Sequence, residues 1–180
     1  CGKSTLLKLL LRFWQKDGGT IAYNGADIDT INTGSLLDQV TMVSQTTYLF
    51  DETIEENLRI ARPDANREEI ETACRMASVH DLILTLPDGY QTRVGTLGDN
   101  LSAGEKQRIG LARVFLRGSS VILLDEPTSN VDSINEGIIL RALKEQKQDK
   151  CILLVSHRES TMAIADRVYS VEGGVLHEQR

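Results

Sequence analysis

The sequence has 180 residues, 41% of them hydrophobic and 26% charged, which is typical of one globular domain with an apolar core. The net charge of −6 lacks the basic footprint of nucleic-acid-binding proteins, so we expect no direct contact with nucleic acid. No apolar run reaches the roughly 18 residues that span a bilayer, and no signal-peptide pattern opens the chain.

The first half of the chain predicts a helix, two strands and a helical block. Residues 5–13 are leucine-rich, and their apolar positions cover most of a helix circumference, which predicts burial on more than one side. These positions are Leu6, Leu7, Leu9, Leu10 and Leu11. Residues 20–23 and 40–44 are rich in β-formers and predict strands. From residue 50 to residue 78, apolar residues recur at helical spacing.

The second half predicts alternating helices and strands. A turn-rich stretch leads to a helix from Ser102 to Gly118. Residues 121–124 and 151–155 are continuous apolar runs, which are typical of parallel strands buried on both faces. Between them, Ser133 and Glu136 have the spacing of a capping box and predict the start of another helix.

The end of the chain predicts a short helix after His157 and two strands at 168–172 and 175–177. Together the elements predict an α/β core from about residues 1–50 and 118–180, with a helical insertion at about 51–117. Cys1, Cys74 and Cys151 match neither a disulfide framework nor a metal-ligand spacing, so we expect packing roles in a reducing compartment.

The first residues carry a phosphate-binding pattern. Gly2-Lys3-Ser4-Thr5 opens a helix, as in the second half of a phosphate-binding loop, where main-chain amides wrap the phosphates and lysine reaches the β and γ groups. Ser4 would coordinate Mg²⁺. Because the chain starts at Cys1, directly before this pattern, we expect a fragment that begins inside a functional loop. The tetrapeptide alone fits an ordinary helix start equally well.

Two adjacent carboxylates, Asp125 and Glu126, end an apolar strand. Ligands of open α/β sheets gather at the carboxyl ends of strands. We expect Asp125 to hold Mg²⁺ and Glu126 to act as a general base on an attacking water. The alternative is an acidic turn before Pro127.

The stretch Leu101-Ser-Ala-Gly-Glu105 has two compatible interpretations. Ser102 and Glu105 have the spacing of a capping box, which is a structural role. A helix start with a serine hydroxyl and the amide of Gly104 is also an anion site. A glycine in the first helical turn favours the second interpretation, because it permits close approach at a cost in stability.

Gln45 and His157 each follow a predicted strand. Singly, either fits a satisfied polar strand end. Together they would bring an amide that orients water and an imidazole that contacts a γ-phosphate to the same sheet edge as Asp125 and Lys3. His80 and His177 have no such placement, and we expect them at the surface.

The order of these motifs resembles the ATP-binding cassette (ABC) family over almost the whole chain. The resemblance implies a P-loop NTPase core with a mostly parallel sheet, an inserted α-helical subdomain, and ATP and Mg²⁺ as ligands. By this resemblance Gly2, Lys3, Ser4 and Thr5 belong to the Walker A motif, and Gln45 is the Q-loop residue and a metal ligand. Residues 101–105, with Ser102 and Gly104, form the signature, and residues 121–125 form the Walker B motif, which ends in the metal ligand Asp125. Glu126 is then the catalytic carboxylate, Asp132 lies in the D-loop, and His157 is the switch histidine.

Two stretches resemble exporters in particular, residues 45–58 after the Q-loop and residues 89–95 before the signature. The resemblance implies an ATP-hydrolysing motor at the cytoplasmic face of the cell membrane, with transmembrane domains upstream on the same chain. It also implies a second cassette whose nucleotide faces Ser102, Gly104 and Asp132. The alternatives are a soluble non-transport ABC ATPase and a regulatory cassette that binds nucleotide without hydrolysis.

Four residues depart from the family pattern: Ala103, Glu105, Asn130 and Arg93. Glu105 would bring a carboxylate near an incoming γ-phosphate unless it turns back to cap Ser102. We therefore hypothesise that the signature is weakened, as in a heterodimer with one better site.

Overall fold

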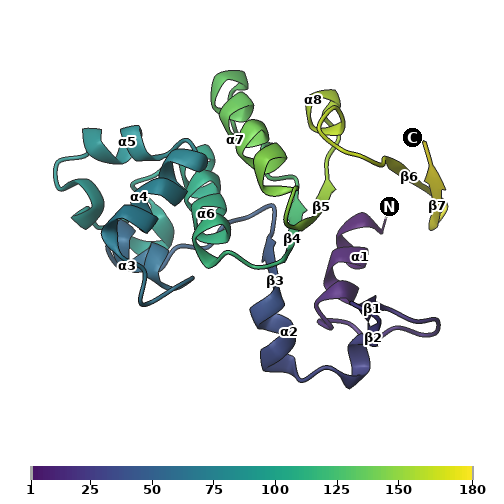
Figure 1. Cartoon of the computed structure of the whole chain (residues 1–180). Helices are drawn as coiled ribbons and strands as arrows, with labels where there is room; N and C mark the ends of the chain where they lie inside the picture. Colours follow the sequence, from purple (N-terminus) through teal and green to yellow (C-terminus); the bar gives the residue numbers. More distant parts are fainter. Residues whose placement is uncertain (1, 180) are drawn as a thin grey trace.

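Three parallel strands form the centre of the molecule, whose computed structural model describes residues 2–179 (Figure 1). They are β3 (Val40–Val43), β4 (Val121–Asp125) and β5 (Cys151–Val155), in the order β3-β4-β5. Two antiparallel ribbons lie apart from this sheet: β1 (Ala22–Tyr23) with β2 (Ala26–Asp27), and β6 (Tyr169–Glu172) with β7 (Val175–Glu178). The parallel sheet and the final strand pair were predicted, whereas β2 was not.

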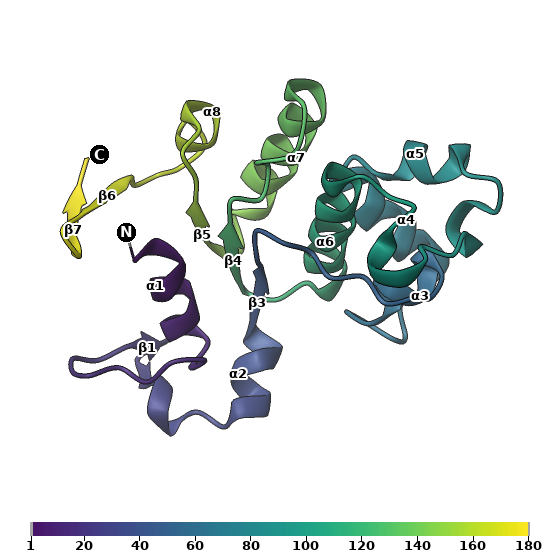
Figure 2. The same ribbon diagram turned by 180° about the vertical axis from the view of Figure 1, so that it is seen from behind.

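Helices surround this sheet on both sides. They are α1 (Lys3–Leu10), α2 (Thr33–Gln39), α3 (Ile54–Arg59), α4 (Arg67–Met76), α5 (His80–Thr85), α6 (Ala103–Arg117), α7 (Ser133–Gln146) and α8 (Glu159–Met162). Short 3₁₀ turns are η1 (Ile28–Thr30), η2 (Gly89–Gln91) and η3 (Thr96–Gly98). The helices α3 to α6 gather on one side of the strands, and α1 with β1 and β2 lies on the other (Figures 1 and 2). None of the helices within residues 2–179 combines the length and apolarity needed to cross a membrane.

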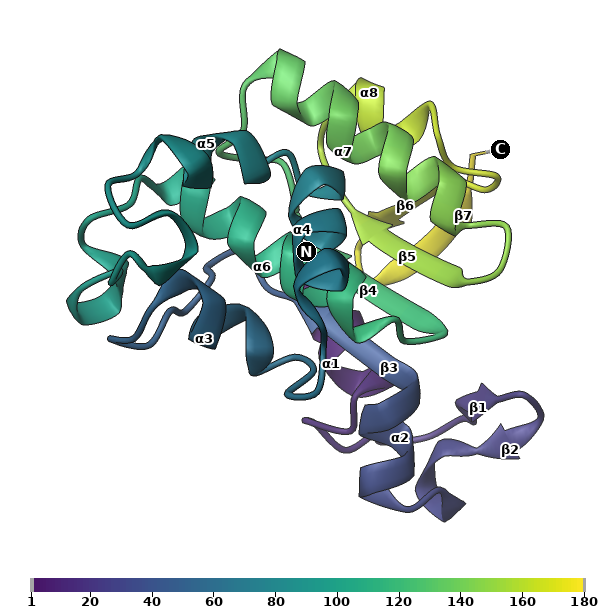
Figure 3. The same ribbon diagram turned by 60° about the vertical axis from the view of Figure 1, so that its left-hand side comes forward.

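Alternating side chains of β4 separate two apolar clusters. Ile122 and Leu124 pack with the buried faces of α6 and α7, whereas Leu123 packs with Leu7 of α1. This alternation follows from the strand period of two, which sends successive side chains to opposite faces. Figure 3 shows the three strands side by side with α7 along them. The first cluster runs from the sheet into α3–α6, and the division into a core and a helical subdomain stays a prediction.

The burial expected for α1 and β5 is only partly correct. In α1 only Leu7 is fully buried, and Leu6, Leu9 and Leu10 are half-buried, because one face of the helix packs against β4. Strand β5 lies at the edge of the three-stranded sheet, so Leu153 is 37% exposed.

The packing role expected for the cysteines holds for only one of the two that the structure describes. Cys151, at the start of β5, is exposed, so its predicted packing role is wrong. Cys74 is buried as expected, and burial raises the pKa of its thiol to about 11. Cys1 lies outside the described residues.

One capping box was predicted correctly and one was not. Ser102 accepts from the amide of Glu105, whose carboxylate accepts from the amide of Ser102, so α6 begins as the sequence indicates. At α7 the cap is Asp132 rather than Ser133, because its carboxylate accepts from the amides of Ile134 and Asn135. Glu136, the expected partner of Ser133, turns inward instead.

Helix α6 packs closely on the segment after β3. A Cβ atom on Gly110 would lie 2.5 Å from Oγ1 and 2.9 Å from Cγ2 of Thr47, closer than atoms can pack. Thr47 is short and β-branched, so it cannot move aside by rotating a distant end. Glycine at position 110 therefore sets the distance between α6 and the segment that carries Gln45.

We expect Gly110→Ala to destabilise the domain by about 1–3 kcal/mol through overpacking. Gly137→Ala is the matched control, because nothing lies within 4 Å of a Cβ on Gly137 of α7. That change should stabilise by up to about 1 kcal/mol, since alanine is the better helix former. Thermal unfolding of both variants checks the pair, and equal midpoints would contradict the close contact.

Candidate active site

The register of the parallel sheet brings several predicted site residues to one edge. Val43 pairs with Leu124, and Asp125 pairs with Val155, so the three strands end at the same level. The segments that follow these ends carry Gln45, Glu126 and His157. Carboxyl ends of parallel strands are the usual ligand edge of an α/β sheet.

Four side chains form a continuous series of contacts at this edge. Gln45 Nε2 donates to Glu126 Oε2 at 3.4 Å, and the other oxygen, Oε1, lies 3.6 Å from His157 Nε2. Lys3 Nζ is 3.1 Å from the same imidazole nitrogen. The residues come from α1 and from the ends of three neighbouring strands. The structure therefore brings together the amide, carboxylate, imidazole and ammonium groups that the sequence indicated.

The start of α1 supplies main-chain donors beside Lys3. Gly2 has φ +88°, a left-handed conformation that glycine adopts without strain, and its carbonyl accepts the first helical bond, from Leu6. The amides of Lys3, Ser4 and Thr5 therefore precede the helical ladder and are free to bind an anion. Ser4 and Thr5 are exposed.

Asp125 lies on the face of β4 that packs on α1, two residues beyond Leu123. It is 8% exposed, and within residues 2–179 no donor hydrogen bonds to its carboxylate. A carboxylate in that position favours a cation as its partner. No group of three or more His, Cys, Asp or Glu side chains gathers in the described part of the chain. This donor set fits Mg²⁺, which takes one or two protein oxygens and completes its shell with phosphate and water.

The main chain of Glu126 is in an uncommon conformation, with φ +50°. Its amide donates to Val155 of β5 at 2.9 Å, and its carbonyl accepts from Gln107 of α6 at 2.7 Å. Sequence reasoning missed Gln107. The signal was a polar residue at helical spacing from Leu111 and Val114, which are both buried.

The residues of the predicted signature contact the 126–132 loop of their own chain. A Cβ on Gly104 would lie 2.4 Å from the carbonyl oxygen of Asn130, so the close approach that glycine permits here is to that loop. Ser102 is exposed at the start of α6. Glu105 turns back onto Ser102, with Oε2 accepting from the Ser102 amide at 2.7 Å.

Asp132 is exposed and caps α7. Hydrogen bonds from the side chain and the main chain of Asn135 hold the pKa of Asp132 below its usual range. The carboxylate is therefore an ionised cap near neutral pH, and it lies at the end of the loop that begins with Glu126.

An ion pair between a half-buried arginine and a buried carboxylate links the same loop to the turn of His157. Arg158 donates to Glu136 Oε2 at 2.7 Å and also to the carbonyls of Ser129 and Val131. Glu136 is 7% exposed, and its second oxygen accepts from Thr128 and Ser160. Sequence reasoning missed both partners, because it assigned Glu136 to a cap and stopped at His157.

The other histidines lie away from this edge. His177 is exposed, as predicted. His80 is half-buried with Nδ1 2.8 Å from the hydroxyl of Tyr90, so the expectation of a surface position is wrong. The physical reason is that the phenol of buried Tyr90 uses the imidazole as its hydrogen-bond partner.

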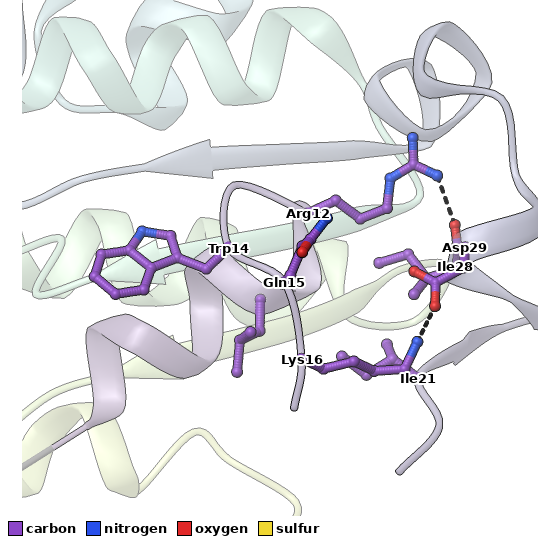
Figure 4. A pocket seen from close by; sticks show the side chains of 8 residues that line it. Arg12, Trp14, Gln15, Lys16, Ile21, Ile28 and Asp29 are labelled. Atoms are coloured by element: carbon purple, nitrogen blue, oxygen red, sulfur yellow. Dashed lines mark hydrogen bonds and ion pairs between the residues drawn. The ribbon is translucent and has the colours of Figure 1, made fainter. Parts of the chain in front are cut away.

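A hollow of about 390 Å³ lies between the end of α1 and η1 (Figure 4). Its charged groups are already paired: Arg12 donates to the carbonyls of Ile28 and Ile31, and Lys16 pairs with Asp29. None of the predicted site residues lines it. The hollow is therefore separate from the sheet-edge site.

The model of one protein family, the ABC transporters, matches residues 1–129. The chain belongs to this family. The family resemblance predicted from the order of the motifs is thus confirmed.

Relatives of this ABC chain are longer proteins that combine two functions in their names. A Haemophilus influenzae protein named "Probable ABC transporter ATP-binding/permease protein" is 58% identical over 96% of this chain and 31% of its own length. A Bacillus subtilis protein named "Putative multidrug export ATP-binding/permease protein YgaD" is 44% identical over 98% of this chain and 30% of its own. The chain thus spans about a third of the length of these relatives.

A solved structure shares the ABC fold. It is titled "Structure of a bacterial Atm1-family ABC exporter with ATP bound" and superposes with a TM-score of 0.93 at 36% identity, covering 97% of this chain and 31% of that one. The predicted fold class, an ABC ATPase with a parallel sheet and added helices, is confirmed. The chain thus corresponds to about a third of that exporter's length and shares the fold of that part of it.

We expect Arg158→Met to destabilise the cassette by about 3 kcal/mol, because it leaves Glu136 buried without its cation. Arg141→Met is the control, since Arg141 pairs with Glu145 on the surface of α7 and such a pair contributes less than about 1 kcal/mol. Thermal unfolding should show a lower midpoint for the first variant only. Equal midpoints would show that the pair of Arg158 and Glu136 does not stabilise the 126–132 loop.

Proposed function

We propose that this cassette binds and hydrolyses ATP with Mg²⁺ and drives an exporter-type transporter. The observation that carries the proposal is the series of contacts from Gln45 through Glu126 and His157 to Lys3. Phosphoryl transfer needs positioned charges and little covalent chemistry from the protein. This edge of the sheet supplies the ammonium group of Lys3, the carboxylate of Glu126 and main-chain donors together.

The proposed mechanism divides the site between binding and proton transfer. The amides of residues 3–5 and Nζ of Lys3 bind the phosphates of ATP. Ser4, Asp125 and Gln45 would hold Mg²⁺, which would supply positive charge to offset the negative charge of the phosphates. Glu126 accepts the proton of the attacking water, Gln45 orients that water, and His157 contacts the γ-phosphate.

A second cassette, of the same or another chain, completes the proposed site. Ser102 and Gly104 at the start of α6, with Asp132 at the start of α7, would face the nucleotide bound by the partner. Ser102 and Asp132 are exposed, which such an arrangement requires. Closure over ATP would exclude water, and donors are most effective where water is excluded. The capping role of Glu105 removes one argument for a weakened signature, because a glutamine at position 105 would cap Ser102 in the same way.

The proposed contact with transmembrane domains lies where the two exporter-like stretches meet. Residues 52–54 pair with residues 92–94 through main-chain bonds, and the Arg93 guanidinium donates to the carbonyl of Asp51 at 2.7 Å. Beside them Tyr48 and Phe50 stack edge to face and are 56% and 49% exposed. Exposed aromatic pairs of this kind are typical of interfaces.

The names of the relatives support the same partner. They join an ATP-binding part and a permease part in one chain, which supports transmembrane domains on the same chain as this cassette. Their upstream position and the place of the cassette at the cytoplasmic face of the cell membrane are what the family resemblance implies. The division into a core and a helical subdomain at residues 51–117 belongs to this proposal.

Removing the metal should abolish hydrolysis while leaving the fold intact. We expect phosphate release by the full-length protein to fall to background with EDTA and to return with added Mg²⁺, because Asp125 and Ser4 bind phosphate charge only through the cation. The measurement is phosphate release across a Mg²⁺ titration. Turnover that persists in EDTA would contradict the proposed metal ligands.

Replacing the proposed base should separate binding from hydrolysis. We expect Glu126→Gln to lower kcat by about 10²–10⁴-fold and to retain ATP in a stable cassette dimer, because the amide keeps the contacts but cannot accept a proton. Single-turnover hydrolysis checks the loss of kcat, and size-exclusion chromatography with ATP checks the stable dimer. Glu145→Gln on the surface of α7 is the control, and wild-type turnover by Glu126→Gln would overturn the assignment.

A further inference from the structure

Gln107 is a buried polar side chain that the proposed mechanism does not use. It lies in the second turn of α6 and is 1% exposed. Its amide nitrogen donates to the carbonyl of Glu126 at 2.7 Å and to Ser129 Oγ at 3.3 Å. Its oxygen accepts from the amide of Asn130 at 3.1 Å. All of its side-chain hydrogen bonds therefore go to the single loop 126–130.

The main chain of Glu126 needs such support. A residue with a Cβ at φ +50° is disfavoured by about 1–2 kcal/mol relative to the right-handed region. Its amide is fixed by Val155 of β5, at 2.9 Å. Its carbonyl is fixed by Gln107. The peptide groups on both sides of the Glu126 side chain are thus held by neighbouring elements.

The bond from Gln107 is not needed merely to satisfy the loop. The carbonyl of Glu126 already accepts from the amide of Ser129, at 3.2 Å, within the turn. A buried carbonyl with one donor is satisfied. The side-chain amide of Gln107, as a second donor, therefore fixes the orientation of the peptide plane that follows Glu126.

Gly104 brings the same helix onto the same loop. Its missing Cβ allows the carbonyl of Asn130 to approach, as a Cβ would lie 2.4 Å from that oxygen. The first two turns of α6 therefore contact both ends of the turn 126–130. A shift of α6 along its axis would pull directly on the main chain of Glu126.

We propose that Gln107 is a positioning residue that holds the main chain of Glu126 and links the start of α6 to the general base of the same chain. The inference rests on the proposed function, because it assigns Glu126 that role. Since the start of α6 would face the nucleotide of the partner cassette, a change at one ATP site would reach the base of the other through this amide.

The test uses Gln107→Met in the full-length protein. Methionine has a similar size and shape, so the helix can pack while all three bonds to the loop are lost. We expect kcat to fall about 10- to 100-fold, as small misplacements of a catalytic group cost that much, while the KM for ATP changes less than about threefold. Rates are normalised to the number of bound ATP analogues, so that unfolded protein does not count. Gln39→Met, at an exposed position of α2, is the matched control.

A second variant, and the same variant in a protein that lacks the proposed base, distinguish positioning from a general structural effect. Gln107→Asn keeps the amide but withdraws it by one methylene, and it should lose activity like methionine. In a Glu126→Gln background, Gln107→Met should change residual turnover less than about twofold, because a residue that acts through Glu126 has nothing left to position. Equal losses in both backgrounds, or normalised kcat within twofold of wild type, would overturn the inference. Absence of ATPase activity in the wild type would instead refute the proposed function.

Discussion

The shared register of β3, β4 and β5 is the constraint on which the rest of this structure depends. Successive side chains of β4 alternate between the cluster of α6 and α7 and the cluster of α1. A slip by one residue would reverse both faces, exposing Ile122 and Leu124 to the wrong neighbours. The pattern that fills the two clusters also turns Asp125 toward α1. Core packing and the orientation of Asp125 therefore depend on the same register.

The sequence predicted most of the elements that have a strong pattern. The start of α6 was found because a cap marks it, β4 and β5 because each is a continuous apolar run, and β3 because its residues are β-formers. Short elements such as α2 and β2 were missed, since a few residues carry little periodicity. The wrong cap at α7 shows a different limit. Asp132 and Ser133 are both good caps, and only the inward turn of Glu136 toward Arg158 decides between them.

The site residues also divide into those that a local sequence pattern indicates and those that depend on distant contacts. Lys3, Gln45, Glu126 and His157 were predictable because each stands directly after a strand or at a helix start, and parallel strands end at one edge. Gln107 and Arg158 were not, because their partners are distant in sequence. Arg113 illustrates the point: it donates to the carbonyls of Tyr48 and Asn57, and burial lowers its pKa to about 10. No local pattern indicates which carbonyls a half-buried arginine will contact.

The loop from Glu126 to Asp132 is held between two elements, and this arrangement limits how it can move. From one side α6 contacts it through Gln107 and the backbone of Gly104. From the other side Arg158, the residue after His157, donates to the carbonyls of Ser129 and Val131. Packed segments that share buried hydrogen bonds move together or lose those bonds, which costs about 1–3 kcal/mol for each unsatisfied group. A displacement of α6 that keeps these bonds therefore also moves the main chain of Glu126 and the side chain of Arg158, the residue after His157.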